Sequence, residues 1–348
     1  MMRVLLAAVC LMLLAAPLQA GSLDDLKAAN AAAEQGKADD AIRLFNQALA
    51  AGDLSPADQF TARKGRGGEY TAKSLIADAF ERIDQARGLR ADAIADFTAA
   101  LAIKTDDAAL YIARAQVYDL NGQNDSAIAD FDAALKLNNA PVTLVQRASS
   151  MSAKGDYDRA IADYTAALAI VSKDAKDTKD TKDTKDAGID AMDIHSERGY
   201  AQFIAARYAA AAADFEKALT LGSAARTGDV LWLPYQAAWL HIARARAGEN
   251  DAEELARNAG KIDLKQWPGT LIAFFLGQAK ADQLSPPSSH GAMGRGRECN
   301  LSFFTGEQAL IKNDGAEAAR LFVRARAVCN IHTVHYLAAR VELKRLGK

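Results

Sequence analysis

The sequence predicts an all-α fold, a solenoid of helix-turn-helix units stacked side by side. The segment Ala-Ile-Ala-Asp-Phe-x-Ala-Ala-Leu at Ala93–Leu101 returns at Ala127–Leu135 after 34 residues, and 33 residues later at Ala160–Leu168 with Tyr164 in place of Phe. A fixed period of that size is typical of stacked-repeat proteins. Within each copy the small residue, the aromatic residue four places later and the alanine three places after that share one helical face. Half of the residues are hydrophobic but only 7% are aromatic, which favours an alanine-rich helical stack.

Weaker copies of the same segment extend the array toward both ends of the chain. They begin at Ala41, Ala211 and Ala318. In four copies a glycine stands five residues before the segment, where the preceding helix must end and the chain must turn. We therefore expect turns at Gly36, Gly88, Gly122 and Gly155.

The residues at fixed positions of this unit resemble the tetratricopeptide repeat (TPR) family. In the family register, Gly199 and Gly306 stand eighth in the first helix and Tyr118 stands eleventh. The resemblance covers most of residues 22–348. It implies a right-handed superhelix whose concave side is lined by the first helix of each unit. The large residue at position 24 of the family pattern is matched by Phe97, Phe131, Tyr164, Phe215 and Phe322.

An arginine occupies position seven of three units, where the family more often has leucine. Each of these units also carries an aspartate at position 23. An alternative interpretation is a ladder of arginines that binds anions, but every arginine has a carboxylate at fixed spacing. We expect salt bridges that cross between the two helices of a unit and fix their register. The predicted pairs are Arg114–Asp130, Arg147–Asp163 and Arg198–Asp214.

The N-terminus has the pattern of a secretory signal peptide over residues 1–20. Arg3 is followed by the apolar run Val4–Ala16, which is too short to span a bilayer, and a small residue precedes the polar start at Gly21. We expect cleavage after Ala20 and a periplasmic mature protein without an integral membrane segment. A lipid anchor on Cys10 is disfavoured, because Val9 precedes that cysteine where a small residue is expected.

The charge balance argues against nucleic acid as a partner. The chain has 42 basic and 44 acidic residues, and loss of the leader removes one arginine. Binding to phosphates requires clustered positive charge, which a slightly acidic chain does not supply.

Two cysteines, Cys299 and Cys329, remain once the leader has been removed with Cys10. They stand at positions one and 31 of the same unit, where the start of the first helix lies beside the end of the second. We expect a disulfide between them in an oxidising compartment. Two buried free thiols are the alternative.

Two insertions interrupt the period. Residues 57–73 contain the glycine-rich run Arg63–Gly68. It lacks the spacing of a phosphate-binding loop, so a lengthened or extra helix is expected.

The second insertion, Lys173–Asp186, repeats Lys-Asp-Thr and has no apolar stripe. This composition predicts a mobile spacer, and transient helix formation is the alternative. The expected parts of the mature chain are an N-terminal TPR array at 21–172, a charged flexible insertion at 173–190, TPR and degenerate helical repeats at 191–284, a loop at 285–298 and a C-terminal TPR-like unit with a trailing helix at 299–348.

The C-terminal part resembles the NlpI family of bacterial envelope TPR lipoproteins. The resemblance extends over about 110 residues and rests on Trp239, Trp267, Phe274–Gly277, Ser302–Gly306 and His332–Tyr336. It implies an adaptor that brings murein hydrolases and a periplasmic protease together, and a homodimer. Assembly of the outer membrane or of an exported polymer is the rival function.

The sequence offers little for catalysis, and we expect no enzyme activity, no cofactor and no metal. His332 and His335 are one helical turn apart and could share a metal, but no third ligand follows from the spacing. Packing or capping by these histidines is the favoured interpretation, and a metal-assisted hydrolase is the alternative. No Gly-x-Ser-x-Gly motif occurs.

A concave surface therefore remains as the expected site of function. It should bind proteins or extended peptides along the first helices of the units. Contact with water alone or with a second copy is the alternative. The residues expected to face this groove are Ile112, Gln116, Asp119, Val145, Ser149, Tyr200 and Phe203.

Overall fold

The computed structural model describes residues 21–177, 189–225, 232–284, 292–331 and 333–348. In these ranges the regular structure is helical, and successive helices pack against each other in pairs. The all-α helix-turn-helix solenoid predicted from the period is thus confirmed. The predicted signal peptide and residues 178–188 of the charged insertion lie outside the described residues.

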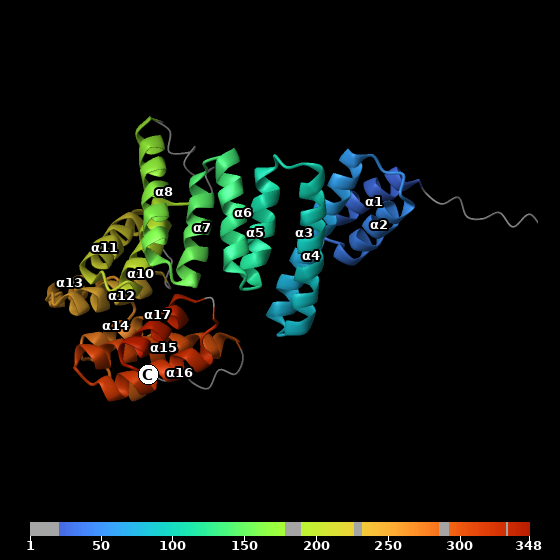
Figure 1. Cartoon of the computed structure of the whole chain (residues 1–348). Coiled ribbons are helices and arrows are strands. Elements are labelled where there is room, and N and C mark those ends of the chain that lie inside the picture. The colour runs from blue at the N-terminus through green and yellow to red at the C-terminus, as the bar shows by residue number, and fades with distance from the viewer. Residues whose placement is uncertain (1–20, 178–188, 226–231, 285–291, 332) are drawn as a thin grey trace, which may run out of the picture. The chain divides into compact units, whose positions relative to one another are not determined.

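The helices cluster into two compact units, which divide between Asn121 and Gly122. In the first unit α3 and α4 form the longest pair, and Figure 1 shows them running side by side beyond the ends of α2 and α5. Its helices are α1 (Ser22–Glu34), α2 (Ala38–Ala51), α3 (Pro56–Ala79), α4 (Ile83–Ile103) and α5 (Ala108–Leu120).

The second unit contains the regular repeats from α6 onward and the C-terminal helices. Figure 1 shows α6, α7 and α8 side by side and the C-terminal helices α14 to α17 below them. The helices are α6 (Asn124–Leu137), α7 (Pro141–Lys154), α8 (Tyr157–Asp177), α10 (Ala191–Ile204), α11 (Tyr208–Ala225), α12 (Trp232–Ala247), α13 (Ala252–Ala259), α14 (Gly269–Phe275), η1 (Ala281–Leu284), α15 (Ala292–Ile311), α16 (Gly315–Val328) and α17 (Val334–Arg345).

The turns between paired helices each contain a residue with left-handed φ, which in most units stands five places before the alanine that begins the repeated segment. Gly36, Gly122 and Gly155 have φ of 69°, 71° and 96° there, as the sequence predicts. Gly88 was the wrong choice, because it lies inside α4 and the turn of that unit is made by Glu81, with φ of 59°. Other units make the same turn with the non-glycine residues Ala206 and Asn313.

The period is broken by lengthening of one hairpin, which confirms the lengthened helix expected for residues 57–73. Arg66 and Asp96 are 30 residues apart, whereas the equivalent Arg147 and Asp163 are 16 apart. The turn at Glu81 divides the additional residues equally, seven in each helix. Seven residues are close to two helical turns, so both helices keep the same face toward their neighbours.

Two predicted domain boundaries need correction. Helix α8 continues to Asp177, so the first residues of the predicted charged insertion are helical. Helix α15 begins at Ala292, within the predicted loop 285–298. Its added turns are held to the next helix, since Glu298 pairs with Arg324 of α16.

A glycine at position eight receives the ring at position 24 in the core of several hairpins. A Cβ atom added to Gly67 would lie 2.6 Å from Cε1 of Phe97. At Gly199 it would lie 2.7 Å from the ring of Phe215. The rings therefore occupy the space that a side chain would need, which brings the two helices of a hairpin close together.

The C-terminal helices share a core built on Trp239, which is 1% exposed. Its indole ring lies within 5.5 Å, between centroids, of the rings of Phe203, Phe303 and Phe304. Burial of such rings contributes strongly to stability. In the described residues no helix is long and apolar enough to cross a membrane.

Candidate protein-binding surface

Two of the three predicted arginine-aspartate pairs join the two helices of a hairpin in the second unit, through two hydrogen bonds each. Arg147 donates from Nε and Nη2 to Asp163 at 2.7 and 2.8 Å. Arg198 does the same to Asp214, at 2.8 Å for both bonds. The structure contains another such pair that the sequence analysis missed, in which Arg66 binds Asp96 at 2.7 and 2.6 Å. The additional residues of the long hairpin hid it from a search at fixed spacing.

The remaining Nη1 of each arginine reaches the preceding hairpin. It donates in every case to the residue directly after the position 24 aromatic of that hairpin. Each arginine therefore links two consecutive hairpins. The acceptors are Asn46 for Arg66 (2.5 Å), Thr98 for Arg114 (2.9 Å), Asp132 for Arg147 (2.5 Å) and Thr165 for Arg198 (2.9 Å).

The electrostatics of these pairs fit a structural role. The hydrogen bonds that Arg147 donates to Asp163 raise the pKa of Arg147, despite its partial burial. Burial alone would raise the pKa of Asp214, but the hydrogen bonds from Arg198 and His195 outweigh it and lower that pKa. Since the guanidinium groups are committed to protein acceptors, the structure disfavours the anion-binding ladder. Arg114 and Asp130 belong to different units, so their pairing stays a prediction.

The residues expected to face a groove separate into accessible and buried ones. In the first unit Gln116 is exposed, and Ile112 and Asp119 are half-buried. In the second unit Ser149 is exposed and Tyr200 is half-buried.

Two groove predictions are wrong. Phe203 is 0% exposed because its ring packs against Trp239 and Tyr208. Val145 is 7% exposed and belongs to the core around Tyr164. A helical position that faces a groove in an open solenoid becomes a core position where further helices cover it.

A polar cluster on the inner helices of the second unit includes residues that the sequence analysis did not select. A hydrogen bond of 3.1 Å joins Ser149 Oγ and Tyr164 OH. Gln236 Nε2 donates to Tyr200 OH at 2.9 Å. The carboxylate of Glu197 acts electrostatically on both tyrosines. The Glu197 cluster, as we name these five residues, thus draws on α7, α8, α10 and α12.

Glu197 is the chemically distinctive member of the cluster. Its side chain is exposed to solvent. Desolvation by the surrounding protein, followed by repulsion from Asp193, raises the pKa of Glu197 to about 7. The carboxylate is thus surrounded by protein groups that disfavour its ionised form, although the residue has solvent-accessible surface. A cation placed beside it would favour the ionised form.

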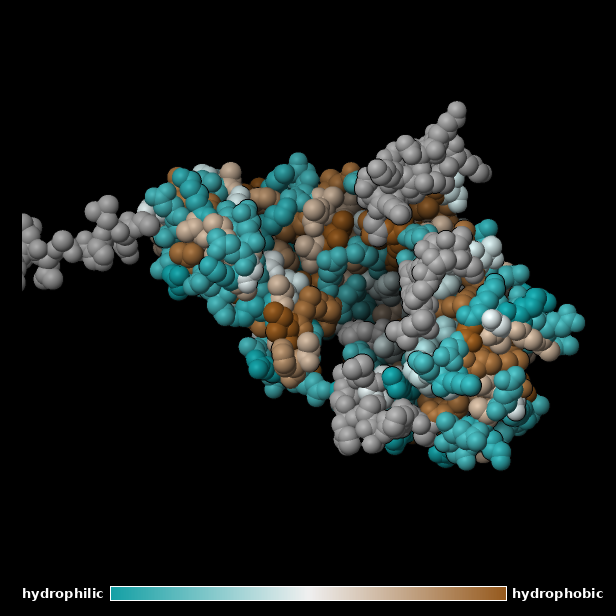
Figure 2. Space-filling view, turned by 180° about the vertical axis from the view of Figure 1, so that it is seen from behind, coloured by the Kyte–Doolittle hydropathy of each residue, from teal (hydrophilic) through white to brown (hydrophobic). Residues whose placement is uncertain are grey.

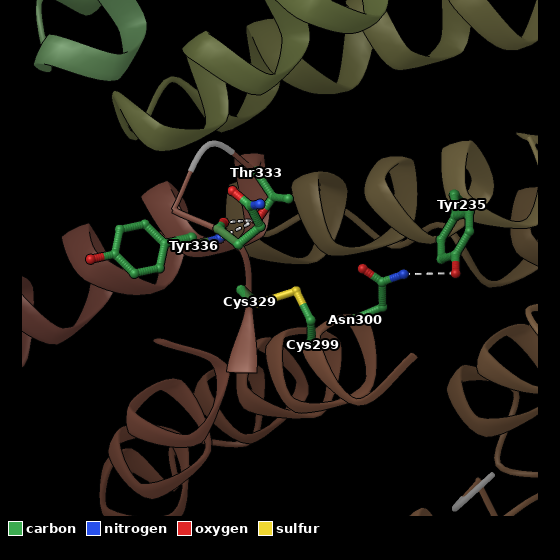
Figure 3. The surroundings of a disulfide bond; sticks show 7 residues. Tyr235, Cys299, Asn300, Cys329, Thr333 and Tyr336 are labelled. Atoms are coloured by element: carbon green, nitrogen blue, oxygen red, sulfur yellow. Dashed lines mark hydrogen bonds between the residues drawn. A yellow bond between two sulfur atoms is a disulfide. The ribbon is translucent and has the colours of Figure 1, made fainter. Parts of the chain in front are cut away.

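The predicted disulfide is present. Cys299 Sγ and Cys329 Sγ are bonded, and the Cα atoms are 4.8 Å apart. Figure 3 shows the bond between the two chain segments, with Asn300 beside it. Asn300 Nδ2 donates to Tyr235 OH at 2.7 Å, which connects this hairpin to α12. The bond closes a loop at the C-terminal end of the array.

Of the two histidines near the C-terminus, the structure describes one. His332 lies outside the described residues. The ring of His335 contacts those of Trp239, Phe303 and Phe304. Burial lowers the pKa of His335 to about 3. Its packing role is thus confirmed, and no group of three or more metal-ligating residues occurs among the residues described.

Comparison with known proteins agrees with the geometry. The tetratricopeptide repeat family matches residues 108–141. That segment of the chain thus has the sequence pattern of one tetratricopeptide repeat. A solved TPR protein from Parabacteroides merdae is 14% identical over 92% of this chain and 98% of its own, with a TM-score of 0.51. That likeness shows the fold alone.

Two further solved structures are similar at lower scores. The C-terminal part of a TPR protein from Cytophaga hutchinsonii is 16% identical, over 87% of this chain and 95% of its own, with a TM-score of 0.48. YrrB, titled a TPR protein with an unusual peptide-binding site, is 16% identical over 67% of this chain and 91% of its own, with a TM-score of 0.36.

Proposed function

We propose that this TPR protein is a scaffold that holds an extended segment of a partner protein against the inner helices of its second unit. The Glu197 cluster is the observation that carries the proposal. It presents the exposed Glu197 carboxylate and the exposed Ser149 hydroxyl beside the half-buried Tyr200. The buried Tyr164 and Gln236 hold the Ser149 and Tyr200 hydroxyls from behind. Such groups accept and donate hydrogen bonds to a peptide backbone, the usual ligand of stacked helical repeats.

The partner segment should carry a lysine or arginine that reaches Glu197. The unliganded carboxylate has a pKa of about 7 because it is poorly hydrated and lies near Asp193. A cationic side chain stabilises the ionised form only, so binding releases a proton from the fraction of protein in which Glu197 is protonated. Affinity for a basic segment should therefore increase between pH 6 and pH 8.

The scaffold acts in the bacterial envelope under this proposal. Three features support that location: the leader-like residues 1–20, the disulfide between Cys299 and Cys329, and the resemblance of the C-terminal part to the NlpI family. Murein hydrolases or a periplasmic protease are the partners that this resemblance implies. Sequencing the N-terminus of the protein purified from the periplasm tests export, and we expect it to begin at Gly21.

A panel of fluorescent peptides tests the binding site. The panel consists of extended peptides of one length with Lys, Gln or Glu at a central position, and binding is followed by anisotropy at pH 6 and pH 8. We expect the Lys series to bind best, and Glu197→Gln to weaken it about tenfold at pH 8 and to abolish the pH dependence. Glu253→Gln is the matched control, since Glu253 lies exposed on α13.

Equal binding of the three series, or an unchanged affinity in Glu197→Gln, would reject the site. A photo-reactive residue at position 149 then identifies the natural partner in periplasmic extract. Labelling of wall hydrolases or a protease supports the adaptor role, whereas labelling of another copy of the chain contradicts it.

A further inference from the structure

The long α3–α4 hairpin is a second surface with no role in the function proposed above. Its added residues extend each helix by two turns, about 10 Å at the usual rise per residue. Neighbouring helices in the same unit lack these turns. The added part of the hairpin, which we name the α3–α4 extension, spans residues 73–90.

The extension is held together by small and charged residues rather than by its large apolar ones. Ala77 and Ala86 are buried where the two helices meet, at 3% and 0% exposure. Arg90 pairs with Asp78 across the hairpin. Of the five large apolar residues of the extension, Leu89 is half-buried, and the other four are exposed.

The large apolar side chains of the extension instead face solvent. The exposed fractions are 48% for Leu75, 56% for Ile76, 67% for Phe80 and 55% for Ile83. Four large hydrophobic residues this exposed within nine positions of sequence form a patch, and such patches mark interaction surfaces. Figure 2 shows hydrophobic surface gathered at the lower end of this unit.

A cavity of about 570 Å³ adjoins the patch. Its lining includes Ile76 of the patch and the charged residues Lys37, Lys73 and Arg82. Two carboxylates, Asp39 and Asp40, also line it.

Some of the charged residues that line the cavity form ion pairs, and others do not. Asp39 pairs with Lys73, and Asp40 pairs with Arg43. No ion pair of Lys37 or Arg82 is present among the described residues. The guanidinium of Arg82 lies 5.4 Å from the centroid of the exposed Phe80 ring. Two cations without a carboxylate partner thus lie beside an apolar patch.

We propose that the α3–α4 extension binds an acidic, apolar segment of a partner protein. Apolar side chains of the segment cover Ile76, Phe80 and Ile83, and a carboxylate of the segment pairs with Lys37 and Arg82. The Glu197 cluster favours the opposite charge. The protein therefore offers two surfaces that select different partners, which is what an adaptor requires.

Fluorescent amphipathic peptides test this proposal on the full mature chain. The probes share one Leu and Phe pattern and carry Glu, Gln or Lys at the polar positions. We expect the Glu series to bind at least tenfold more tightly than the Lys series. The double variant Ile76→Ser, Phe80→Ser should weaken binding at least tenfold, and Lys37→Glu, Arg82→Glu should reverse the preference in favour of the Lys series.

Val323→Ser is the matched control, because Val323 is equally exposed, at 57%, on α16. All changed side chains are exposed, and circular dichroism checks that each variant folds. Equal affinity for the Glu and Lys series, or full binding by the Ile76→Ser, Phe80→Ser variant, overturns the proposal. Analytical ultracentrifugation tests whether a second copy of the chain covers the patch instead. Self-association that Phe80→Ser abolishes would assign the patch to a second copy and contradict the proposal. Glu197→Gln should leave the binding of these amphipathic peptides unchanged. Failure of the proposed peptide site at the Glu197 cluster can therefore be told apart from failure of the proposal for the α3–α4 extension.

Discussion

Arg198 donates a hydrogen bond to Thr165, a residue 33 positions earlier in the preceding hairpin, at 2.9 Å. The same guanidinium makes two hydrogen bonds to Asp214 in its own hairpin. The Thr165 hydroxyl also donates to the carbonyl of Ile161, so it uses both of its hydrogen-bonding capacities. One side chain thereby couples the folding of two neighbouring hairpins.

We expect Arg198→Ala to reduce the free energy of unfolding by about 2–4 kcal/mol, because Asp214 stays buried with His195 as its remaining partner and loses two charge-assisted hydrogen bonds. Thr165→Val should cost about 0.5–1.5 kcal/mol in the wild-type background and almost nothing in Arg198→Ala. Urea unfolding of the four proteins of this cycle measures both effects. Thr220→Val is the control, since Thr220 makes the same bond to a carbonyl of its own helix, Glu216, but receives none from an arginine. Equal costs for Thr165→Val in both backgrounds would contradict the link.

The adjacent glycines of α3 should respond in opposite directions to alanine. Gly67→Ala places a Cβ atom 2.6 Å from Phe97 and should destabilise the protein by about 1–3 kcal/mol. Gly68→Ala meets no atom within 4 Å and should stabilise it by about 0.5–1 kcal/mol through helix propensity. Thermal and urea unfolding check the signs. A stabilised Gly67→Ala variant would show that the hairpin can open at no cost.

Removal of the disulfide should lower the free energy of unfolding by about 3–4 kcal/mol, because the bond closes a loop over a sequence separation of 30 residues. The Cys299→Ala, Cys329→Ala double variant and the reduced wild type should behave alike in urea. Dithiothreitol should have no effect on the double variant. Mass spectrometry of a digest made without reductant should find the two cysteine peptides joined, and alkylated thiols in the native protein would contradict the bond.

A buried carboxylate in the C-terminal helices should make stability depend on pH. Glu307 is 0% exposed and accepts a hydrogen bond of 2.5 Å from Arg246, which also contacts Glu342. Burial, partly opposed by Arg246, raises the pKa of Glu307 from 4.5 to about 8. The folded protein then holds a proton that the unfolded chain releases, so stability should fall as pH rises from about 4.5 to about 8.

The Glu307→Gln variant imitates the protonated form and should lose most of this slope. Urea midpoints at pH 5.5 and pH 8.5 compare it with the wild type. Glu253→Gln, at an exposed position, should leave the slope intact. A wild-type protein whose stability does not fall over this range more than that of Glu307→Gln would show that Glu307 is ionised throughout.

Features set by local spacing were predictable from the sequence. The Ala and Phe pattern places the hairpins, and the spacing within one unit places Cys299 beside Cys329 and Arg147 beside Asp163. These pairs depend only on the geometry of two antiparallel helices. The prediction of a chain reversal at Gly88 was wrong because it also relied on local spacing. Lengthening each helix by about two helical turns keeps the apolar pattern in phase but moves the chain reversal to Glu81.

Features set by contact between distant helices were not predictable in this way. Phe203 stands at a position that faces the groove in an open repeat, but Trp239 of a later helix covers it. Glu197 was not selected, because its high pKa arises from surrounding protein and from Asp193 rather than from its place in the motif. Sequence periodicity specifies which face of a helix is inward, and only the packing specifies what occupies that side.

The equal division of the added residues on either side of Glu81 implies that the long hairpin can be shortened without disturbing its neighbours. Excision of seven residues from each of its helices would bring Arg66 and Asp96 to the separation of 16 found in Arg147 and Asp163. Such a chain should keep its other hairpins in place, since the rotational phase of both helices is retained. The α3–α4 extension would then be dispensable for folding, because the hairpin that carries it should fold equally well without it.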